Sequence, residues 1–192
     1  MIEEENKRRK KIAEYKRNLL LIGEAMRLLI HSRKKEKYML KIYNLKDKQE
    51  YLKEVATLTQ REWGKCDLSK EEFENKVNKK IEKIQNYFEN PNYCKLILLE
   101  GEQLIGFISI FPNDGEERKE LSPWYATMYV KKEFRGNGYS KILNNAILNE
   151  AKKRKINKLY LKTKLENYYE KFGAKFIEEL SNGEKLYYFD LK

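Results

Sequence analysis

Two glycines in the middle of the chain provide the backbone freedom that a phosphate-binding loop needs. Gly136 and Gly138 follow Arg135 and precede a run of residues with helical spacing. Glycine adopts backbone conformations in which successive N–H groups point into one concavity. The N-terminus of a helix adds unsatisfied N–H groups and the positive end of its dipole. The segment is therefore suited to bind a diphosphate.

Basic side chains stand beside these glycines and strengthen that interpretation. They are Lys131, Lys132, Arg135 and Lys141, and Asn137, Tyr139 and Ser140 complete the segment. Positive charge next to a phosphate strengthens its hydrogen bonds. A glycine pair alone would be weak, because many strand-to-helix turns use glycine only for steric reasons. Here the arginine, both glycines, a preceding strand and a following helix coincide.

The elements around this loop form a predicted β-α-β crossover. The apolar run at residues 124–130 predicts a buried strand that ends just before the loop. A helix follows, with one apolar face, and residues 158–163 predict the next strand. The face of the helix comprises Ile142, Leu143, Ala146, Ile147 and Ala151.

The remaining elements indicate a mixed α/β fold. We expect a strand at residues 38–43, a helix at about 47–63, and a second helix opened by a capping box of Ser69 and Glu72. A hairpin at 95–100 and 103–111, a short helix at 168–172, and two last strands joined by Asn182-Gly183 follow. The fold class is a mostly antiparallel sheet of about six to seven strands, flanked by helices.

Two motifs resemble the GNAT superfamily of N-acetyltransferases. Arg135-Gly-Asn-Gly138-Tyr-Ser140 is similar to its cofactor signature, with serine in place of the last small residue. Tyr168-Tyr-Glu-Lys-Phe-Gly-Ala174 resembles its second hallmark, about 30 residues later. The resemblance covers residues 38–191 and implies transfer of an acetyl group from acetyl-CoA to an amine by direct attack.

The resemblance also implies roles for individual residues. The cofactor-binding set is Met128, Val130, Arg135, Gly136, Asn137, Gly138, Tyr139, Ser140 and Lys141. Backbone groups near Met128 and Val130 would pair with the pantetheine amides, and Tyr169 falls at the position that protonates the departing sulfur. The family's asparagine seven residues before this tyrosine is replaced by Lys162, and Asn167 is a candidate substitute.

The sequence does not identify the acceptor substrate. The substrate would be a small-molecule or peptide amine, and no general base is identified. Glu62, Asp67 and Glu120 are candidates to border the acceptor cleft, or else surface carboxylates. Trp63 and Trp124 are either walls of that cleft or core residues.

The first 37 residues form a separate basic segment. Residues 1–38 contain twelve Lys or Arg against six Glu. Apolar residues recur at spacings of three and four, which predicts an amphipathic helix. This helix would either fold back over its own domain, or pair with a second copy as a homodimer, or dock another partner. We therefore expect an extension at 1–37 and an acyltransferase domain at 38–192. The apolar residues are Ile12, Tyr15, Leu19, Ile22, Met26 and Leu29.

Composition excludes several other classes. With only Cys66, Cys94 and His31, a metal site of Cys and His is not expected. The longest apolar stretch has twelve residues and carries charges, so no membrane span is expected and the location should be cytoplasmic.

The net charge of +11 suits a phosphorylated cofactor or a nucleic acid. A CoA-binding regulator, or a protein directed at nucleic acid or tRNA through its basic helix, is the alternative, although no aromatic-rich RNA-binding motif accompanies that charge.

Overall fold

The computed structural model describes residues 4–5, 14, 17–24, 26–27, 39–65, 67–115 and 117–192. The chain divides into two units: residues 1–40 with 100–102, and residues 41–99 with 103–192. In the first unit, residues 17–24 are helical, and Leu19 and Ile22 of the predicted stripe are exposed there, as is Met26. Ile12, Tyr15 and Leu29 of the same stripe lie outside the described residues.

The second unit is built on a twisted sheet whose described part has seven strands in the order β1-β2-β3-β4-β5-β7-β6. The pairs β3/β4, β5/β7 and β6/β7 are antiparallel, and β4/β5 is parallel. The mixed, mostly antiparallel fold class is therefore confirmed. The strands are β1 (Leu40–Asn44), β2 (Cys94–Glu100), β3 (Gln103–Phe111), β4 (Trp124–Val130), β5 (Lys158–Thr163), β6 (Lys175–Glu179) and β7 (Lys185–Asp190).

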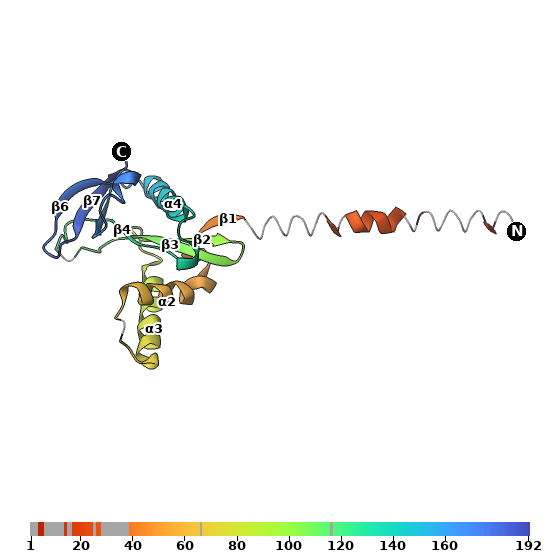
Figure 1. The fold of residues 1–192 in the computed structure, drawn as a ribbon, viewed down its shortest axis with the longest axis horizontal. Coiled ribbons are helices and arrows are strands. Elements are labelled where there is room, and N and C mark those ends of the chain that lie inside the picture. Colours follow the sequence, from red (N-terminus) through yellow and green to blue (C-terminus); the bar gives the residue numbers. More distant parts are fainter. Residues whose placement is uncertain are drawn as a thin grey trace. The chain divides into compact units, whose positions relative to one another are not determined.

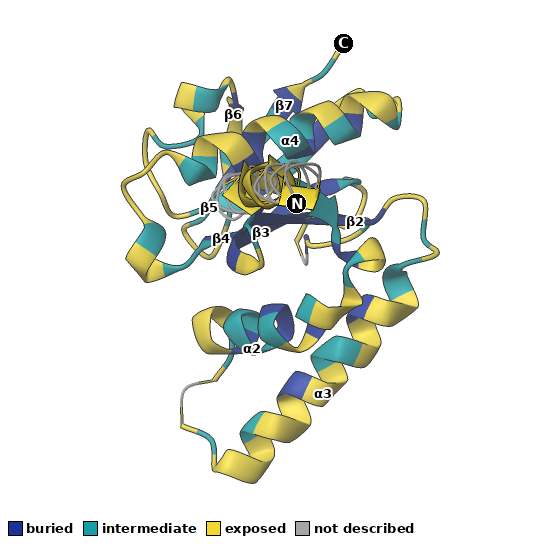
Figure 2. Cartoon of the chain, turned by 90° about the vertical axis from the view of Figure 1, so that its right-hand side faces the viewer, coloured by how far each residue is buried: buried dark blue, intermediate teal, exposed yellow. Residues whose placement is uncertain are grey.

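Three helices cover the sheet on its two faces. Helix α4 (Tyr139–Lys153) lies on one face, and α2 (Leu52–Trp63) and α3 (Lys70–Tyr87) lie on the other (Figure 1). The predicted capping box is present at the start of α3, where Ser69 and Glu72 each accept a hydrogen bond from the other's backbone N–H. Burial is concentrated in the central strands, while α3 is largely exposed (Figure 2).

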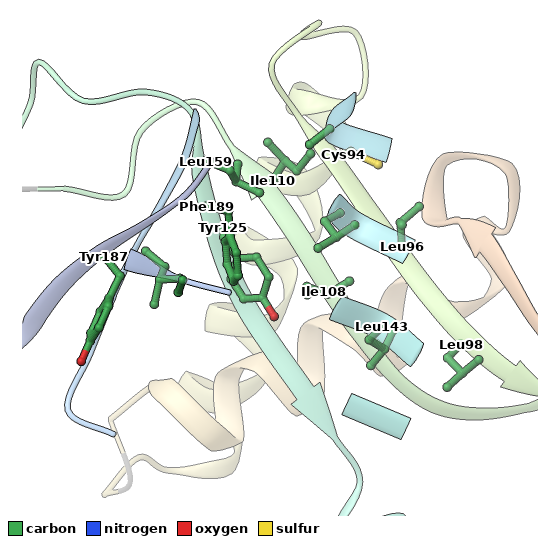
Figure 3. Packing of buried hydrophobic residues seen from close by; sticks show 14 of the residues in the cluster. Cys94, Leu96, Leu98, Ile108, Ile110, Tyr125, Leu143, Leu159, Tyr187 and Phe189 are labelled. Atoms are coloured by element: carbon green, nitrogen blue, oxygen red, sulfur yellow. The ribbon is translucent and has the colours of Figure 1, made fainter. Parts of the chain in front are cut away.

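Apolar residues alternate between the two faces and make two cores. Cys94, Leu96 and Leu98 of β2 pack in the core beneath α4, whereas Ile97 and Leu99 pack in the core beneath α2 and α3. In the first core, Tyr125 of β4 lies against Phe189 of β7 (Figure 3), with ring centroids 5.4 Å apart. The second core also contains Phe107 and Tyr129, which stack at 5.3 Å. The period of two along β2 thus assigns each residue to a face.

Some predicted elements differ in detail. The helix expected from about residue 47 begins at Leu52, because two short 3₁₀ turns (Leu45–Asp47 and Gln49–Tyr51) precede it and Lys48 between them leaves helical geometry. The short helix at 168–172 is a 3₁₀ turn, Glu170–Phe172. The hairpin at Asn182-Gly183 is closed by a hydrogen bond from the Leu180 N–H to the Glu184 carbonyl, with Gly183 in the left-handed region.

Candidate functional site

Strands β4 and β5 separate at the centre of the sheet. Their parallel pairing has the single register pair Trp124↔Tyr160, and the Tyr160 N–H donates to the Pro123 carbonyl. Beyond this point the described strands show no further pairs. The backbone groups in the last part of β4 that face β5 are consequently available to a ligand, apart from the Val130 carbonyl, which accepts a hydrogen bond from the Arg135 side chain.

A β-bulge lies in β4 where this separation develops. Phe107 pairs with Tyr129 and Ser109 pairs with Ala126, so two residues of β4, Thr127 and Met128, oppose one residue of β3. Thr127 has a φ of 49°, which is rare for a β-branched residue. Bulges bend a strand and redirect its side chains and backbone groups. This bulge is what re-aims the last part of β4.

The glycine loop follows β4 and has the predicted geometry. Gly136 and Gly138 have φ values of 81° and 77°, and a Cβ on either would meet nothing within 4 Å. Gly138 is the N-cap of α4 and has no side chain to cap the helix. The N–H groups of Tyr139 and Ser140 therefore have no acceptor within the helix, whose first bond runs from the Lys141 N–H to the Gly138 carbonyl. The loop is an open concavity at the positive end of a helix dipole.

Arg135 and Asn137 hold this loop in shape. The Nε of Arg135 donates to the Val130 carbonyl at 2.9 Å, and its guanidinium lies 5.7 Å from the centre of the Tyr129 ring. The Asn137 amide donates to the carbonyls of Phe134 and Arg135. Both side chains thus have structural bonds to the loop backbone. Lys131 pairs with Glu54 at 2.6 Å, while Lys132 and Lys141 are exposed.

A cleft of about 520 Å³ collects most of the predicted site residues. Asn137 and Lys141 of the predicted set do not line it. The predicted residues that do are Met128, Val130, Arg135, Gly136, Gly138, Tyr139, Ser140 and Tyr169. The end of β4, the glycine loop, the start of α4 and the segment before the 3₁₀ turn at 170–172 therefore meet around one space.

Tyr169 is half-buried in the wall of this cleft. Its ring lies edge-on to Tyr125 at 5.6 Å and to Tyr168 at 5.0 Å. Within the described residues its hydroxyl has no hydrogen-bond partner, whereas the Tyr125 hydroxyl bonds to Asn144 and Met128. Burial, followed by the neighbouring Tyr168, raises the pKa of Tyr169 to about 12. Its phenol is therefore a neutral, unengaged donor at physiological pH.

The three candidate carboxylates have different surroundings. Glu62, at the end of α2, is the single carboxylate among the residues that line the cleft, and it lies 3.8 Å from Arg135. Glu120 bonds to Arg118, which also contacts Glu178. Asp67 is exposed in the loop between α2 and α3. Only Glu62 can therefore contact a ligand in this cleft.

The two tryptophans also differ. Trp124 is fully buried and donates from its indole nitrogen to the Leu121 carbonyl, so it is a core residue and the cleft-wall interpretation is wrong for it. Trp63 is half-exposed beside Tyr129, at 6.1 Å between centroids, but does not line the cleft. Asn167, the proposed substitute for the missing asparagine, also does not line the cleft. It is exposed and has a φ of 53°.

Several lining residues carry no sequence signal of their own. Tyr129, Phe134, Leu165 and Tyr168 complete the cleft. Leu165 stands in the loop after β5, where a leucine is indistinguishable from a core residue. Thr127 sits in a run that is typical of an uninterrupted strand, so its bulge depends on cross-strand register rather than on residue type.

Other classes of site are not found in the described part of the chain. No cluster of three or more His, Cys, Asp or Glu residues there could hold a metal ion. None of the helices described has the length and apolar character to cross a bilayer. Cys94 is a free thiol, and burial raises its pKa to about 12, which leaves it unreactive.

Comparison with protein families identifies the class. Residues 52–174 match the model of the acetyltransferase (GNAT) family. The match spans α2 to the end of the Tyr169 segment and so includes the whole cleft. The chain therefore belongs to the GNAT acetyltransferase family. No curated protein matches it in sequence.

Solved structures share this fold. The PaiA N-acetyltransferase of Thermoplasma acidophilum, in complex with coenzyme A, is 22% identical over 79% of this chain and 99% of its own, with a TM-score of 0.57. The putative acetyltransferase YncA of Salmonella typhimurium, with acetyl-CoA, is 12% identical over 80% and 94%, with a TM-score of 0.59. An aminoglycoside 6'-N-acetyltransferase complexed with coenzyme A is 18% identical over 79% and 97%, with a TM-score of 0.60.

Proposed function

We propose that this chain is an N-acetyltransferase that moves the acetyl group of acetyl-CoA to a primary amine by direct attack. The observation that supports this most is the convergence of three features on one cleft: the uncapped start of α4, the unpaired end of β4 and the free hydroxyl of Tyr169. The start of α4 would bind the diphosphate, the end of β4 would bind the pantetheine arm, and the Tyr169 hydroxyl would face the sulfur. The family membership supplies the class of reaction.

The loop and β4 suit the two halves of coenzyme A. The glycine loop leaves room for a diphosphate, because no atom lies within 4 Å of where a Cβ would stand at Gly136 or Gly138. The N–H groups at the start of α4 would bind the diphosphate oxygens. The pantetheine amides would then pair with β4 near Met128 and Val130, in the gap left by β5. Asn137 and Lys141 do not line the cleft. Asn137 would hold the loop in shape, and Lys141 would add positive charge that attracts the diphosphate at longer range.

Transfer requires a nucleophile and an exit for the thiolate. A neutral amine attacks the thioester carbonyl, the N–C bond forms, and the C–S bond breaks. The nitrogen loses one proton and the sulfur gains one, so protons balance. Tyr169 is the candidate donor to the sulfur. Its pKa of about 12 lies above that of a thiol, about 8.5. Its main contribution is therefore a hydrogen bond placed to stabilise the developing thiolate.

Glu62 is the residue best placed to favour an amine acceptor. An alkylamine has a pKa of about 10.4 and is mostly protonated at neutral pH. A carboxylate on the cleft wall attracts that cation and can accept its proton directly or through water. Because Glu62 is also near Arg135, it links the acceptor side of the cleft to the loop. We infer that small-molecule or peptide amines are the substrate class.

The test is an incubation of the protein with acetyl-CoA and a panel of amines, including polyamines, aminoglycosides, amino acids and short peptides. Release of free thiol together with a product heavier by one acetyl group supports the proposal. Binding of acetyl-CoA without acetylation of any amine would instead support the CoA-binding regulator. Binding to RNA that weakens steeply with salt, with acetylation confined to aminoacyl-tRNA, would favour the nucleic-acid alternative.

A further inference from the structure

A lysine is buried in the middle of the sheet. Lys95 lies on β2, and its residue is 2% exposed. Ile97, two residues on, belongs to the core beneath α2 and α3. The alternation along the strand therefore directs Lys95 to that face. Lysine is almost never fully buried without a charged partner.

Lys95 reaches across β3 to the bulge of β4. Its Nζ donates to Thr127 Oγ1 at 3.2 Å and lies 4.8 Å from the centre of the Phe107 ring. Thr127 Oγ1 also shares a hydrogen bond with Ser109 Oγ at 2.7 Å. No carboxylate of the described residues acts on Lys95; the charged or titratable groups that do are Cys94 and Lys80. The lysine is thus bonded to the bulge and is not part of an ion pair.

The residue at the other end of this bond is strained. Thr127 has a φ of 49°, and L-residues with a branched Cβ avoid this region. Such a conformation persists only where surrounding bonds hold it. Here the Thr127 hydroxyl is fixed by Lys95 from β2 and by Ser109 from β3. Met128, the next residue, lines the cleft.

The burial of Lys95 and the backbone strain of Thr127 both destabilise the fold, which argues that they serve the site. Burial lowers the pKa of Lys95 to about 7. An apolar side chain of similar length would avoid this cost of burial. Sequences commonly depart from the most stable choice at functional positions. The buried lysine and the strained threonine occur at one point, next to the backbone where the thioester is expected.

We propose that Lys95 is a positioning residue for acetyl transfer: its bond to Thr127 holds the β4 bulge in the conformation that presents the backbone at Met128 to the thioester. The inference depends on the proposed N-acetyltransferase function. Lys95 does not touch the substrate and acts through Thr127. Its loss should therefore misalign the reacting carbonyl without removing the loop that binds the diphosphate.

The test compares Lys95→Met with Lys80→Met. Both variants remove a lysine from the same face, but Lys80, on α3, makes no bond to Thr127 and serves as the control. In Lys95→Met, kcat should fall by roughly ten- to a hundredfold, the scale of a small misplacement of reacting groups. The dissociation constant for acetyl-CoA should change little, and the melting temperature should rise. Lys80→Met should keep the parent's kcat.

A second measurement reports on the bulge without turnover. The amides of Thr127 and Met128 should exchange hydrogen faster in Lys95→Met than in the parent or in Lys80→Met. A parent-like kcat with parent-like exchange in Lys95→Met would overturn the inference. So would a variant with a lower melting temperature or one that fails to fold, since the lysine would then be a stabilising core residue. If the parent itself acetylates no amine, the proposed function fails, and the exchange rates still decide the role of Lys95 at the bulge.

Discussion

The hydroxyl of Tyr169 remains protonated over the whole range in which an enzyme works. Burial in the cleft wall raises its pKa to about 12, so ionisation of this residue cannot limit the rate at moderately alkaline pH. The pH dependence should instead follow the acceptor, which must be a free amine to attack.

We therefore predict a rising pH profile with no descending limb from tyrosine. With an alkylamine acceptor, kcat/KM should increase up to about pH 10, near the pKa of the amine. The profile of Tyr169→Phe should have the same shape at a lower level. Initial rates of thiol release between pH 6 and 10.5 measure this. A fall in rate centred near pH 10, present in the parent and missing in Tyr169→Phe, would show that the tyrosine has an ordinary pKa.

Lys95 gives the stability of the protein its own pH dependence. Its pKa is about 7 in the fold against an ordinary 10.5, so the unfolded chain binds more protons between these values. The free energy of unfolding should therefore rise with pH across this window because of Lys95, by on the order of a few kcal/mol at most. Lys80 adds to the lowering of this pKa, and Cys94 opposes it.

The prediction is that Lys95→Met is more stable than the parent at pH 7 and that this difference shrinks towards pH 10. Urea unfolding of both chains at several pH values measures it. Comparing the two chains cancels the opposing effect of buried tyrosines, whose raised pKa removes stability as pH climbs above 10. A difference that stays constant from pH 7 to 10 would mean that Lys95 titrates normally.

At the scale of elements, the glycine loop is the part whose backbone shape decides cofactor binding. Gly136 and Gly183 make a matched pair, because both have positive φ, 81° and 75°, and open space where a Cβ would stand. Alanine at either position is strained by about 1–2 kcal/mol. Only Gly136 lies in the cleft; Gly183 is in the β6–β7 hairpin.

Gly136→Ala should therefore weaken acetyl-CoA binding by roughly tenfold or more, one lost N–H bond to a phosphate being worth about 1.5–3 kcal/mol. Gly183→Ala should lose a similar amount of stability and keep its affinity. Calorimetric titration with acetyl-CoA and urea unfolding of both variants provide the comparison. Equal losses of affinity in the two would show that the loop is not the binding site.

The elements around the loop could be predicted because their signals are local. The strand at 124–130 and the strand at 158–163 are apolar runs with clear ends, and the capping box of Ser69 and Glu72 marks the start of α3. What could not be predicted depends on pairing between distant strands. The bulge at Thr127 is set by register with β3, and a lysine in a strand, such as Lys95, is typical of a solvent-facing position. The sequence names Glu62 as one of three candidate carboxylates, but only the position of the end of α2 beside the cleft separates it from Asp67 and Glu120.

At the scale of the whole molecule, the basic segment at the start of the chain stands outside the family match. We propose that residues 1–37 are an extension and that residues 38–192 form the acyltransferase domain. The family match lies entirely within the second range. Leucine and isoleucine side chains at residues 19–22 are exposed, and contiguous exposed apolar surface marks interaction sites.

A chain that begins at residue 38 should accordingly bind acetyl-CoA and acetylate a small amine as the parent does. Its oligomeric state, measured by light scattering, distinguishes pairing from packing on the domain. A change from dimer to monomer indicates pairing between copies, and an unchanged oligomeric state with a lower melting temperature indicates packing on its own domain. Loss of acetyl-CoA binding would show that the proposed boundary is wrong.

The central claim is that acetyl transfer occurs in this cleft with Tyr169 at the leaving sulfur. The most direct measurement is the turnover of Tyr169→Phe with an amine that the parent acetylates, alongside Tyr168→Phe, whose ring also lines the cleft. We predict that Tyr169→Phe keeps the parent's melting temperature and acetyl-CoA affinity, while kcat falls by roughly 10²-fold or more. The result that would contradict the account is a Tyr169→Phe chain that turns over at the parent's rate, and a loss confined to Tyr168→Phe would assign the donor to that residue instead.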